Sequence, residues 1–272
     1  MNETEGTFST PDGTDLFTRS WVVEHPRYEV LLVHGLGEHS GRWVGPMAHL
    51  TARGASVYAY DLRGHGRSAG DRIDIDRFEL FYEDISEMAA STVERSGRPW
   101  VLYGHSLGGL QVAGYLISGR APQPNVAILS APAMAADVPA VLRVAATVFG
   151  RIAPGLRVAN SIDGEQLSKD PTVGEIYFAD DLVETKATAR FGKALFDEQG
   201  RLNGSHEAIT TPTLVIHGAD DPLVPPSASA GLANSEGVER RLYPTLRHEL
   251  HNEPEGPEVM ADVADWIDGK LF

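Results

Sequence analysis

Cysteine is absent from this chain, and basic residues are outnumbered by acidic ones. Without cysteine there can be no disulfide bond and no thiolate metal site, although the compartment stays open because oxidising locations permit cysteine without requiring it. The 23 Lys and Arg against 38 Asp and Glu give a formal net charge of −15. Such a charge repels phosphate groups, so the sequence argues against nucleic acid as a partner and predicts that any membrane contact is apolar.

Long apolar segments are absent as well. No run reaches the roughly 18 residues that a membrane-spanning helix needs, and the segment from Met1 to Glu5 has neither the basic nor the apolar region of a signal peptide. We therefore expect a soluble protein of the cytoplasm. The 272 residues allow one or two domains, and a hydrophobic fraction of 42% is ample for a large buried core.

What the sequence does contain is a regular alternation of short β-rich runs with longer helical patterns. These runs predict buried strands at 28–34, 56–60, 100–103, 126–130, 213–217 and 239–243, and helices at 41–53, 78–92, 106–118 and 257–271. A predicted antiparallel hairpin, formed by residues 7–10 and 16–21, precedes them. Strand, helix and strand in this order predict an α/β fold with a mostly parallel, doubly wound sheet.

The alternation breaks between about residues 132 and 206, a stretch far longer than a normal crossover between strands. We predict that residues 132–206 form an inserted helical cap, and that residues 1–131 and 207–272 form the core. Residues 138–153 are typical of a helix that is almost wholly apolar, with polar side chains only at Arg143, Thr147 and Arg151. This helix could pack against the core, cover an apolar pocket as a lid, or do both with different faces.

Two segments match Gly-x-Ser-x-Gly, the pattern that places a nucleophilic serine on a sharp turn from a strand to a helix. Around Ser106 a predicted strand precedes the motif and a predicted helix follows it, which would expose the hydroxyl beside a helix N-terminus. Ser68 is followed instead by the aspartate-rich residues 71–76, which cannot form that helix. We predict Ser106 as the nucleophile, against the alternative of an ordinary N-cap serine.

A serine hydroxyl needs a histidine to take its proton and a carboxylate to orient that histidine. Asp220 and Asp221 follow the strand at 213–217, and the Gly-x-x-Asp spacing favours Asp221. His248 and His251 follow the strand at 239–243, and His248 is the predicted base because it lies nearer the end of the strand. Loops after strands of one parallel sheet share a rim, so the three residues should meet. The two histidines lack the His-Glu-x-x-His spacing of zinc proteases, and no metal is predicted.

Glycines after the strand at 28–34 predict an oxyanion hole. Gly35 and Gly37 give this loop the freedom to aim the backbone N–H of Leu36 at the point where negative charge develops. The N–H of Leu107, the residue after the nucleophile, would be the second donor, and each donor contributes roughly 10²–10³ in rate. A tight turn without a catalytic role is the simpler alternative.

Together these motifs resemble the bacterial monoacylglycerol lipases, which implies a serine hydrolase with the α/β-hydrolase fold. The resemblance is carried by four segments, His-Gly-Leu-Gly-Glu-His-Ser-Gly-Arg at 34–42, Asp-Leu-Arg-Gly-His-Gly-Arg-Ser at 61–68, Gly-His-Ser-Leu-Gly-Gly at 104–109 and His-Gly-Ala-Asp-Asp at 217–221. It covers nearly the whole chain, including 167–171 in the cap and 248–254 near the end. The segment at 34–42 is the most specific, because general esterases rarely carry Glu-His-Ser-Gly-Arg after His-Gly.

The resemblance implies an enzyme that cleaves the ester of a long or medium acyl chain on glycerol, with no metal or organic cofactor. By analogy, Glu38, Arg42 and His251 would hydrogen-bond the glycerol hydroxyls while the cap holds the acyl tail and makes transient apolar contacts with lipid surfaces. Taken by themselves, Glu38 and Arg42 could equally form a surface ion pair of little energetic weight. The segment at 61–68 is expected to pack behind the nucleophile loop without a catalytic role.

Other functions share these motifs. Lysophospholipases and broad-specificity carboxylesterases would use the same triad on a different ester. An aminopeptidase would also need acidic side chains in the cap for the substrate amine; Glu175, Asp180, Asp181 and Glu184 could supply them, although an exposed acidic face is the simpler interpretation. A non-catalytic ligand-binding protein on this fold would have an incomplete triad, whereas all three members are present here. The sequence leaves the oligomeric state open.

Overall fold

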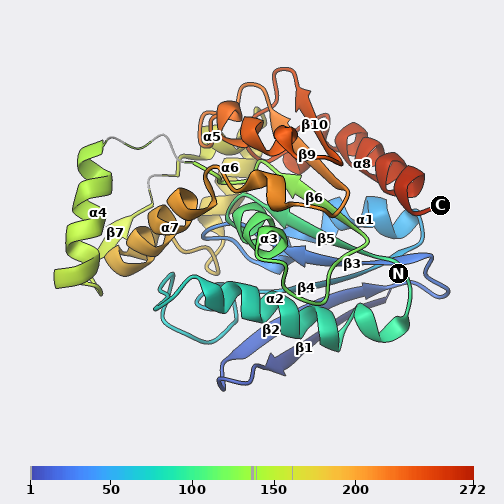
Figure 1. The fold of residues 1–272 in the computed structure, drawn as a ribbon, viewed down its shortest axis with the longest axis horizontal. Coiled ribbons are helices and arrows are strands. Elements are labelled where there is room, and N and C mark those ends of the chain that lie inside the picture. Colours follow the sequence, from blue (N-terminus) through green and yellow to red (C-terminus); the bar gives the residue numbers. More distant parts are fainter. Residues whose placement is uncertain (1, 136–137, 139, 161) are drawn as a thin grey trace.

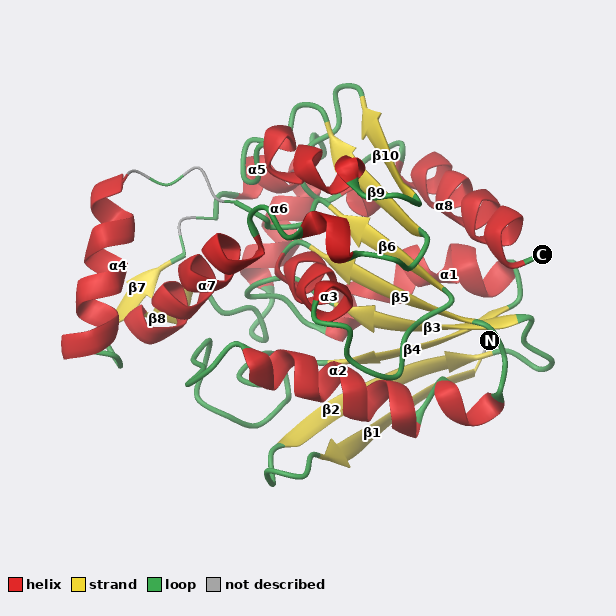
Figure 2. Ribbon diagram, viewed as in Figure 1, coloured by secondary structure: helices red, strands yellow, loops and turns green. Residues whose placement is uncertain are grey.

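The computed structural model describes residues 2–135, 138, 140–160 and 162–272 and centres on an eight-stranded sheet. The strand order in the sheet is β1-β2-β4-β3-β5-β6-β9-β10. β1 and β2 form an antiparallel hairpin, β2 pairs antiparallel with β4, and the remaining neighbours are parallel, as predicted (Figure 2). The strands are β1 (Asn2–Ser9), β2 (Asp15–Val22), β3 (Tyr28–Val33), β4 (Ala55–Tyr60), β5 (Trp100–His105), β6 (Val126–Ser130), β9 (Thr213–Gly218) and β10 (Val238–Tyr243).

Helices cover both faces of this sheet (Figure 1). The core helices are α1 (Val44–Ala52), α2 (Glu79–Ser91), α3 (Leu107–Ile117) and α8 (Gly256–Leu271). Alternate residues of β3 divide between the faces: Leu31 and Val33 pack in the cluster that contains α2 and α3, whereas Val30 and Leu32 pack in the cluster that contains α1 and α8. Because the central strands are buried on both faces, their sequences are continuous apolar runs.

The predicted helix at 41–53 is the core helix whose start differs most from the sequence pattern, whereas α2, α3 and α8 begin within about one residue of their predicted starts. Its first turn is a separate 3-10 helix, η1 (Ser40–Trp43), and α1 begins only at Val44. The reason is tertiary: Asp61 accepts hydrogen bonds from both the N–H of Ser40, at 2.8 Å, and its hydroxyl, at 2.6 Å. This anchor fixes the entry of the chain into η1 and ties it to the segment at 61–68.

Between β6 and β9 the chain leaves the sheet and forms the region predicted as a cap. Its elements are α4 (Ala140–Ile152), β7 (Arg157–Ala159), α5 (Gly164–Leu167), α6 (Pro171–Ala179), β8 (Lys186–Thr188) and α7 (Ala189–Leu202), with β7 and β8 paired antiparallel. α4 and α7 pack together beyond one end of the sheet (Figure 1). The predicted helix at 138–153 corresponds to α4, while residues 136, 137, 139 and 161 of the predicted cap lie outside the described residues. The domain boundaries at 131/132 and 206/207 stay a prediction.

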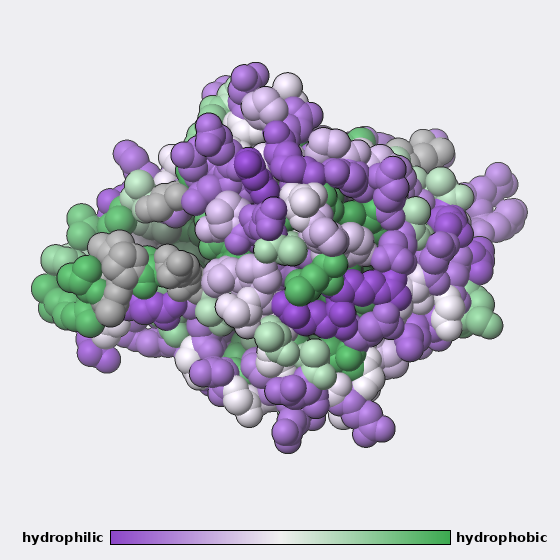
Figure 3. Space-filling model, turned by 90° about the horizontal axis from the view of Figure 1, so that it is seen from above, coloured by the Kyte–Doolittle hydropathy of each residue, from purple (hydrophilic) through white to green (hydrophobic). Residues whose placement is uncertain are grey.

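The outer side of α4 exposes large apolar side chains. Val141, Val144 and Ile152 are 70%, 62% and 72% exposed, and Figure 3 shows the hydrophobic area that they form at the α4 end of the molecule. In the part of the chain that the structure describes, no helix combines the length and the apolar character needed to cross a membrane. Together with Val148, which is 45% exposed, these side chains form an exposed apolar strip along α4.

Candidate active site

Ser106 occupies the turn between β5 and α3. Its φ of 52° lies in the left-handed region, which residues with a side chain rarely adopt outside strained, functional turns. Close packing around the turn requires its glycines: a Cβ on Gly108 would collide with the carbonyl oxygen of Val33, and one on Gly104 with that of Gly108. The N–H of Ser106 donates to the carbonyl of Ser130 at 2.9 Å, which ties the turn to β6. The predicted strand-to-helix turn is confirmed.

The structure brings together the three side chains predicted from separate segments. His248 Nε2 lies 2.9 Å from Ser106 Oγ, and His248 Nδ1 lies 2.8 Å from Asp221 Oδ2. Each of the three residues is less than a tenth exposed. Of the two candidate acids, only Asp221 reaches the imidazole, because Asp220 is exposed at the surface. This arrangement can transfer a proton from the serine hydroxyl to the histidine.

Burial and charge act in opposite directions on the base and the acid. Burial lowers the pKa of His248, but the charge of Asp221 and the hydrogen bond to it raise that pKa to a value above the usual one. Burial raises the pKa of Asp221, but the charge of His248 and hydrogen bonds from His217, His248 and the backbone of Val224 bring it well below its usual range. Asp221 therefore stays ionised and can stabilise an imidazolium.

Asp221 is held by groups that the sequence analysis did not single out. Its Oδ1 accepts from the N–H groups of Leu223 and Val224, both at 2.9 Å. His217 Nε2 lies 3.1 Å from Oδ2, and the other ring nitrogen of His217 lies 2.8 Å from Ser229 Oγ. The signal that could have revealed His217 is its place at the end of a buried strand, where a polar side chain needs a partner.

Leu36 and Leu107, the predicted oxyanion donors, both line the cavity beside Ser106. Leu107 is the first residue of α3, so its N–H has no partner within the helix. Among the described residues, no hydrogen bond is recorded from the N–H of Leu36 or of Leu107. The preceding N–H, that of Gly35, donates to Glu38 Oε1 at 2.6 Å, which fixes the start of the loop. Both residues thus lie at the cavity beside the nucleophile, and their role as oxyanion donors stays a prediction.

The cavity has a volume of about 470 Å³ and extends from Ser106 into the cap. Its side formed by the predicted cap is mostly apolar, although Asn160, Gln166 and Gln199 also line it; the apolar lining residues include Ala145, Ala146, Phe149, Phe191, Leu195 and Phe196. Near the nucleophile the lining includes the polar side chains of Glu38, His105, Tyr177 and Glu249. A mostly apolar chamber with a few convergent polar groups is typical of a small-molecule site, here one suited to an amphiphile.

Comparison with known proteins agrees with this geometry. A family model described as serine aminopeptidase, S33, matches residues 24–255. The monoacylglycerol lipase of Mycolicibacterium smegmatis is 36% identical over 97% of this chain and 96% of the relative. The chain belongs to the monoacylglycerol lipase family. A crystal structure of another family member, the monoacylglycerol lipase of Paleococcus ferrophilus, superposes with a TM-score of 0.81 at 31% identity and covers 99% of this chain and 100% of that one.

The fold of the family is evident at lower identity too. A soluble variant of the monoglyceride lipase of Saccharomyces cerevisiae, crystallised with a substrate analog, has a TM-score of 0.90 at 22% identity, with 100% of this chain and 96% of that chain covered. The predicted family and the predicted α/β-hydrolase fold are therefore both confirmed.

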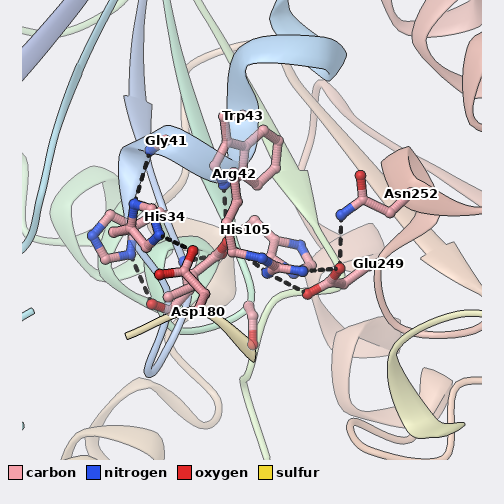
Figure 4. A network of polar contacts seen from close by, with 12 residues as sticks. His34, Gly41, Arg42, Trp43, His105, Asp180, Glu249 and Asn252 are labelled. Carbon is pink, nitrogen blue, oxygen red and sulfur yellow. Dashed lines mark hydrogen bonds and ion pairs between the residues drawn. The ribbon is translucent and has the colours of Figure 1, made fainter. Parts of the chain in front are cut away.

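In this member of the monoacylglycerol lipase family, the three residues assigned to glycerol by resemblance occupy different positions. Glu38 lines the cavity, whereas Arg42 and His251 are not among the lining residues. The guanidinium of Arg42 donates to Glu249 at 2.7 and 2.8 Å and to Glu38 at 3.0 Å (Figure 4). His251 stacks on Trp43 with ring centroids 3.9 Å apart, and both of its ring nitrogens are buried with no hydrogen-bond partner among the residues that the structure describes. Their binding of glycerol stays a prediction.

Glu249, beside the base, is a site residue that the sequence analysis missed. It lines the cavity, accepts both hydrogen bonds of the Arg42 fork, and accepts another from Asn252 at 2.7 Å (Figure 4). Burial raises the pKa of Glu249, but the charge and hydrogen bonds of Arg42 bring it well below the usual value. Burial raises the pKa of Glu38, and Arg42 offsets this only in part. Arg42 thus joins the oxyanion loop to the loop that carries His248.

Arg42→Ala should lower the free energy of unfolding by about 3–5 kcal/mol, because it leaves two buried carboxylates without their cation. Urea unfolding followed by circular dichroism measures this loss. Arg77→Ala is the matched control, since the pair of Arg77 with Glu83 is exposed on both sides and should contribute at most about 1 kcal/mol. Similar small losses in both variants would contradict a buried network.

The sequence analysis also considered a surface ion pair between Glu38 and Arg42. That alternative is wrong, because the two side chains are only 3% and 8% exposed.

The segment at 61–68 was predicted to pack behind the nucleophile loop, which stays a prediction; its hydrogen bonds hold the oxyanion loop and η1. The N–H of Leu62 donates to His34 Nε2 at 2.9 Å, and Asp61 holds Ser40 as described above. Ser68, the serine of the second Gly-x-Ser-x-Gly, is buried, and its hydroxyl accepts a hydrogen bond from the N–H of Phe17 at 2.8 Å. Its role is therefore to join β2 to this segment.

The four acidic residues considered for an aminopeptidase lie outside the cavity lining. Asp180 lies 2.9 Å from His39 Nε2 and Glu184 3.0 Å from an Arg157 nitrogen, while Glu175 and Asp181 are exposed. Because none of them lines the cavity, they provide no acidic subsite for a substrate amine there.

Proposed function

We propose that this protein hydrolyses monoacylglycerols to glycerol and a free fatty acid through an acyl-enzyme on Ser106. The observation that carries the proposal is the hydrogen-bonded chain from Ser106 through His248 to Asp221, placed at the junction of an apolar chamber and a polar wall. The identity to a monoacylglycerol lipase over almost the whole of both chains supports this substrate class. The enzyme class of this protein is therefore that of the carboxylic ester hydrolases.

In the proposed reaction, Ser106 Oγ attacks the ester carbonyl while His248 Nε2 takes its proton. The N–H groups of Leu36 and Leu107 stabilise the oxyanion, and the imidazolium returns the proton to the glycerol oxygen as it leaves. A water molecule, deprotonated by His248, then attacks the acyl-enzyme and releases the fatty acid. Asp221 holds the proton on Nδ1 and stabilises the imidazolium in both halves.

In the bound substrate, we place the glycerol against Glu38 and the acyl chain within the cap, residues 132–206. Glu38 Oε2 already accepts from Arg42 and from Trp43 Nε1, so Arg42 holds the carboxylate in one orientation. We also propose that Arg42 and His251 contact glycerol; because neither lines the cavity, a glycerol hydroxyl has to reach past the side chains that do.

Turnover of monoacylglycerols, lysophospholipids and aminoacyl amides by the purified protein tests the substrate class. We expect the highest kcat/KM for a monoacylglycerol. A higher value for either other class would overturn the proposal. Ser106→Ala, assayed beside the wild type, identifies any turnover due to a contaminating esterase.

The pH profile of kcat/KM should rise through the pKa of His248, because only the neutral imidazole accepts the serine proton. Since Asp221 raises this pKa, the midpoint should lie above the ordinary histidine value of about 6.5. Activity is thus present above the midpoint and is lost as the pH falls through it. A midpoint well below the ordinary value would show that the carboxylate does not control the base.

The exposed strip on α4 supports a transient contact between the cap and lipid surfaces. Val144 and Ile152 are more than half exposed and do not line the cavity. Replacing both by aspartate should reduce turnover of a long-chain monoacylglycerol in phosphatidylcholine vesicles by about tenfold or more, because burying each side chain contributes roughly 1.5–3 kcal/mol. Turnover of a dissolved short-chain ester should not change. Phe272→Asp is the control, an apolar side chain 66% exposed and far from α4 in the fold.

Equal losses for the vesicle and the dissolved ester would contradict a surface contact and indicate damage to the cap itself. The cytoplasmic location expected from the sequence stays a prediction.

A further inference from the structure

A chain of hydrogen bonds continues behind Asp221, on the side away from His248. His217 is fully buried on β9, and its Nε2 lies 3.1 Å from Asp221 Oδ2 and 2.9 Å from the carbonyl oxygen of Val224. Both of these oxygens accept hydrogen bonds, since the carboxylate is ionised and a carbonyl can only accept. Nε2 must therefore carry a proton, and His217 donates to the carboxylate that orients the base.

The other ring nitrogen of His217 faces a serine. Ser229 is fully buried in the 3-10 helix η4 (Pro226–Asn234), and its Oγ lies 2.8 Å from His217 Nδ1. The hydroxyl has one proton and a second acceptor in reach, the carbonyl oxygen of Pro226 at 3.1 Å. If the hydroxyl donates to Nδ1, the ring is neutral; if it turns to Pro226, Nδ1 needs a proton of its own and the ring is a cation.

Arg240 on β10 decides between these two states. Its Nε donates to Ser229 Oγ at 3.1 Å, and its Nη2 donates to the carbonyl oxygen of Pro226. The guanidinium thus already supplies a donor to the acceptor that competes with His217. A second proton on His217 would also place two cations on either side of one oxygen atom, which like charges disfavour. Both effects direct the serine proton to Nδ1 and keep the ring neutral.

The guanidinium of Arg240 differs from that of its neighbour in having no carboxylate partner. Successive residues of a strand point to opposite faces, and Arg241 pairs with Glu239 and with Asp262, at 2.6 Å in each case. Among the described residues, no ion pair is recorded for Arg240, and partial burial lowers the pKa of its guanidinium. A partly buried cation without a counter-charge costs stability. A role in the active site accounts for its placement on Ser229.

We propose that Arg240 is a positioning residue of the active site: through Ser229 it holds His217 neutral, with the ring proton on Nε2. The proposal rests on the proposed function and deepens it, since it extends the triad to β10, the edge strand of the sheet (Figure 1). A neutral His217 gives Asp221 a hydrogen bond without a second positive charge. The negative charge of the carboxylate then remains available to stabilise the imidazolium of His248.

The ring of His217 provides the first test. In protein labelled with ¹⁵N-histidine, NMR distinguishes a neutral ring protonated at Nε2 from the other tautomer and from the cation, and His217→Asn assigns the signals by their loss. We expect the neutral form with the proton on Nε2 at every pH at which the wild-type protein is active. A proton on Nδ1, alone or beside one on Nε2, would overturn the inference. This measurement needs neither a substrate nor a variant of Arg240.

Arg240→Met, which keeps an unbranched side chain, provides the second test. The hydroxyl of Ser229 is then free to turn to Pro226, and the His217 ring should take up a second proton as the pH falls. We expect kcat to fall roughly tenfold, the effect of one lost hydrogen bond, for a monoacylglycerol and for dissolved p-nitrophenyl acetate alike. KM should not change, because Arg240, Ser229 and His217 do not line the cavity.

Arg241→Met is the matched control, since Arg241 lies on the same strand with its partners on the other face. It should leave kcat and the His217 ring as in the wild type. An unchanged ring in Arg240→Met, or equal losses of kcat in the two variants, would reduce Arg240 to a structural residue of β10 and overturn the inference. Wild-type turnover of p-nitrophenyl acetate without turnover of monoacylglycerol would overturn the proposed function alone.

Discussion

Ser106→Ala is expected to lower the turnover of monoacylglycerol on the order of 10⁶-fold, the loss typical of removing a triad nucleophile. The reason is that the acyl-enzyme cannot form without Oγ, while the oxyanion donors and the cavity remain. The substitution removes only Oγ. The strained turn is still held by the hydrogen bond from the backbone N–H of residue 106 to the carbonyl of Ser130. Initial rates with a monoacylglycerol, at matched protein concentration, measure the loss.

Ser68→Ala is the control for that experiment, because Ser68 lies in the other Gly-x-Ser-x-Gly. Its hydroxyl donates to the carbonyl of Asp61 and accepts from the N–H of Phe17, so its removal should cost about 1–3 kcal/mol of stability. The turnover of the folded variant should stay near the wild-type value. Activity retained in Ser106→Ala but lost in Ser68→Ala would show that the wrong serine was chosen from the sequence.

The fold could be predicted because the central strands are buried on both faces and therefore consist almost entirely of apolar residues. β6 (Val126–Ser130) has the predicted bounds, and β5 and β9 extend only slightly beyond theirs. An apolar run between turn residues is enough to locate a strand that is buried on both faces. The start of α1 could not be found in this way, because Ser40 is held by Asp61, a contact between segments that no local pattern records.

The triad could be predicted for a related reason. Parallel strands end at a common rim, so residues in the loops after β5, β9 and β10 are neighbours however far apart they lie in the chain. The Gly-x-x-Asp spacing favoured Asp221 over Asp220, and the structure agrees, since Asp221 is buried against His248 while Asp220 is exposed.

No comparable rule predicts the polar network of Arg42, Glu38 and Glu249 from the sequence. Glu249 follows the base directly, yet its partner Arg42 lies in η1, 207 positions away. A sequence shows that both residues are charged and does not show that they meet in a buried, bidentate pair. His251 is similar: its stacking on Trp43 depends on how two short 3-10 helices, far apart in the chain, dock against each other.

Asp221→Asn is expected to reduce turnover by roughly 10⁴-fold, whereas Asp220→Asn should have a mild effect because that side chain is exposed. In Asp221, Oδ1 accepts from the N–H groups of Leu223 and Val224, and Oδ2 faces His248. An asparagine would keep its oxygen on the two N–H groups and turn its NH₂ toward Nδ1 of His248.

The imidazole of that variant must then accept at Nδ1 and carry its proton on Nε2, the nitrogen that lies 2.9 Å from Ser106 Oγ. A protonated Nε2 donates to the serine and cannot take its proton, so the variant folds and binds substrate but loses its base. Loss of the carboxylate charge should also lower the pKa of His248 and move the acid limb of the residual activity to lower pH. The steady-state rates of both asparagine variants across pH measure these effects. A larger loss in Asp220→Asn would show that the orienting acid is the exposed one.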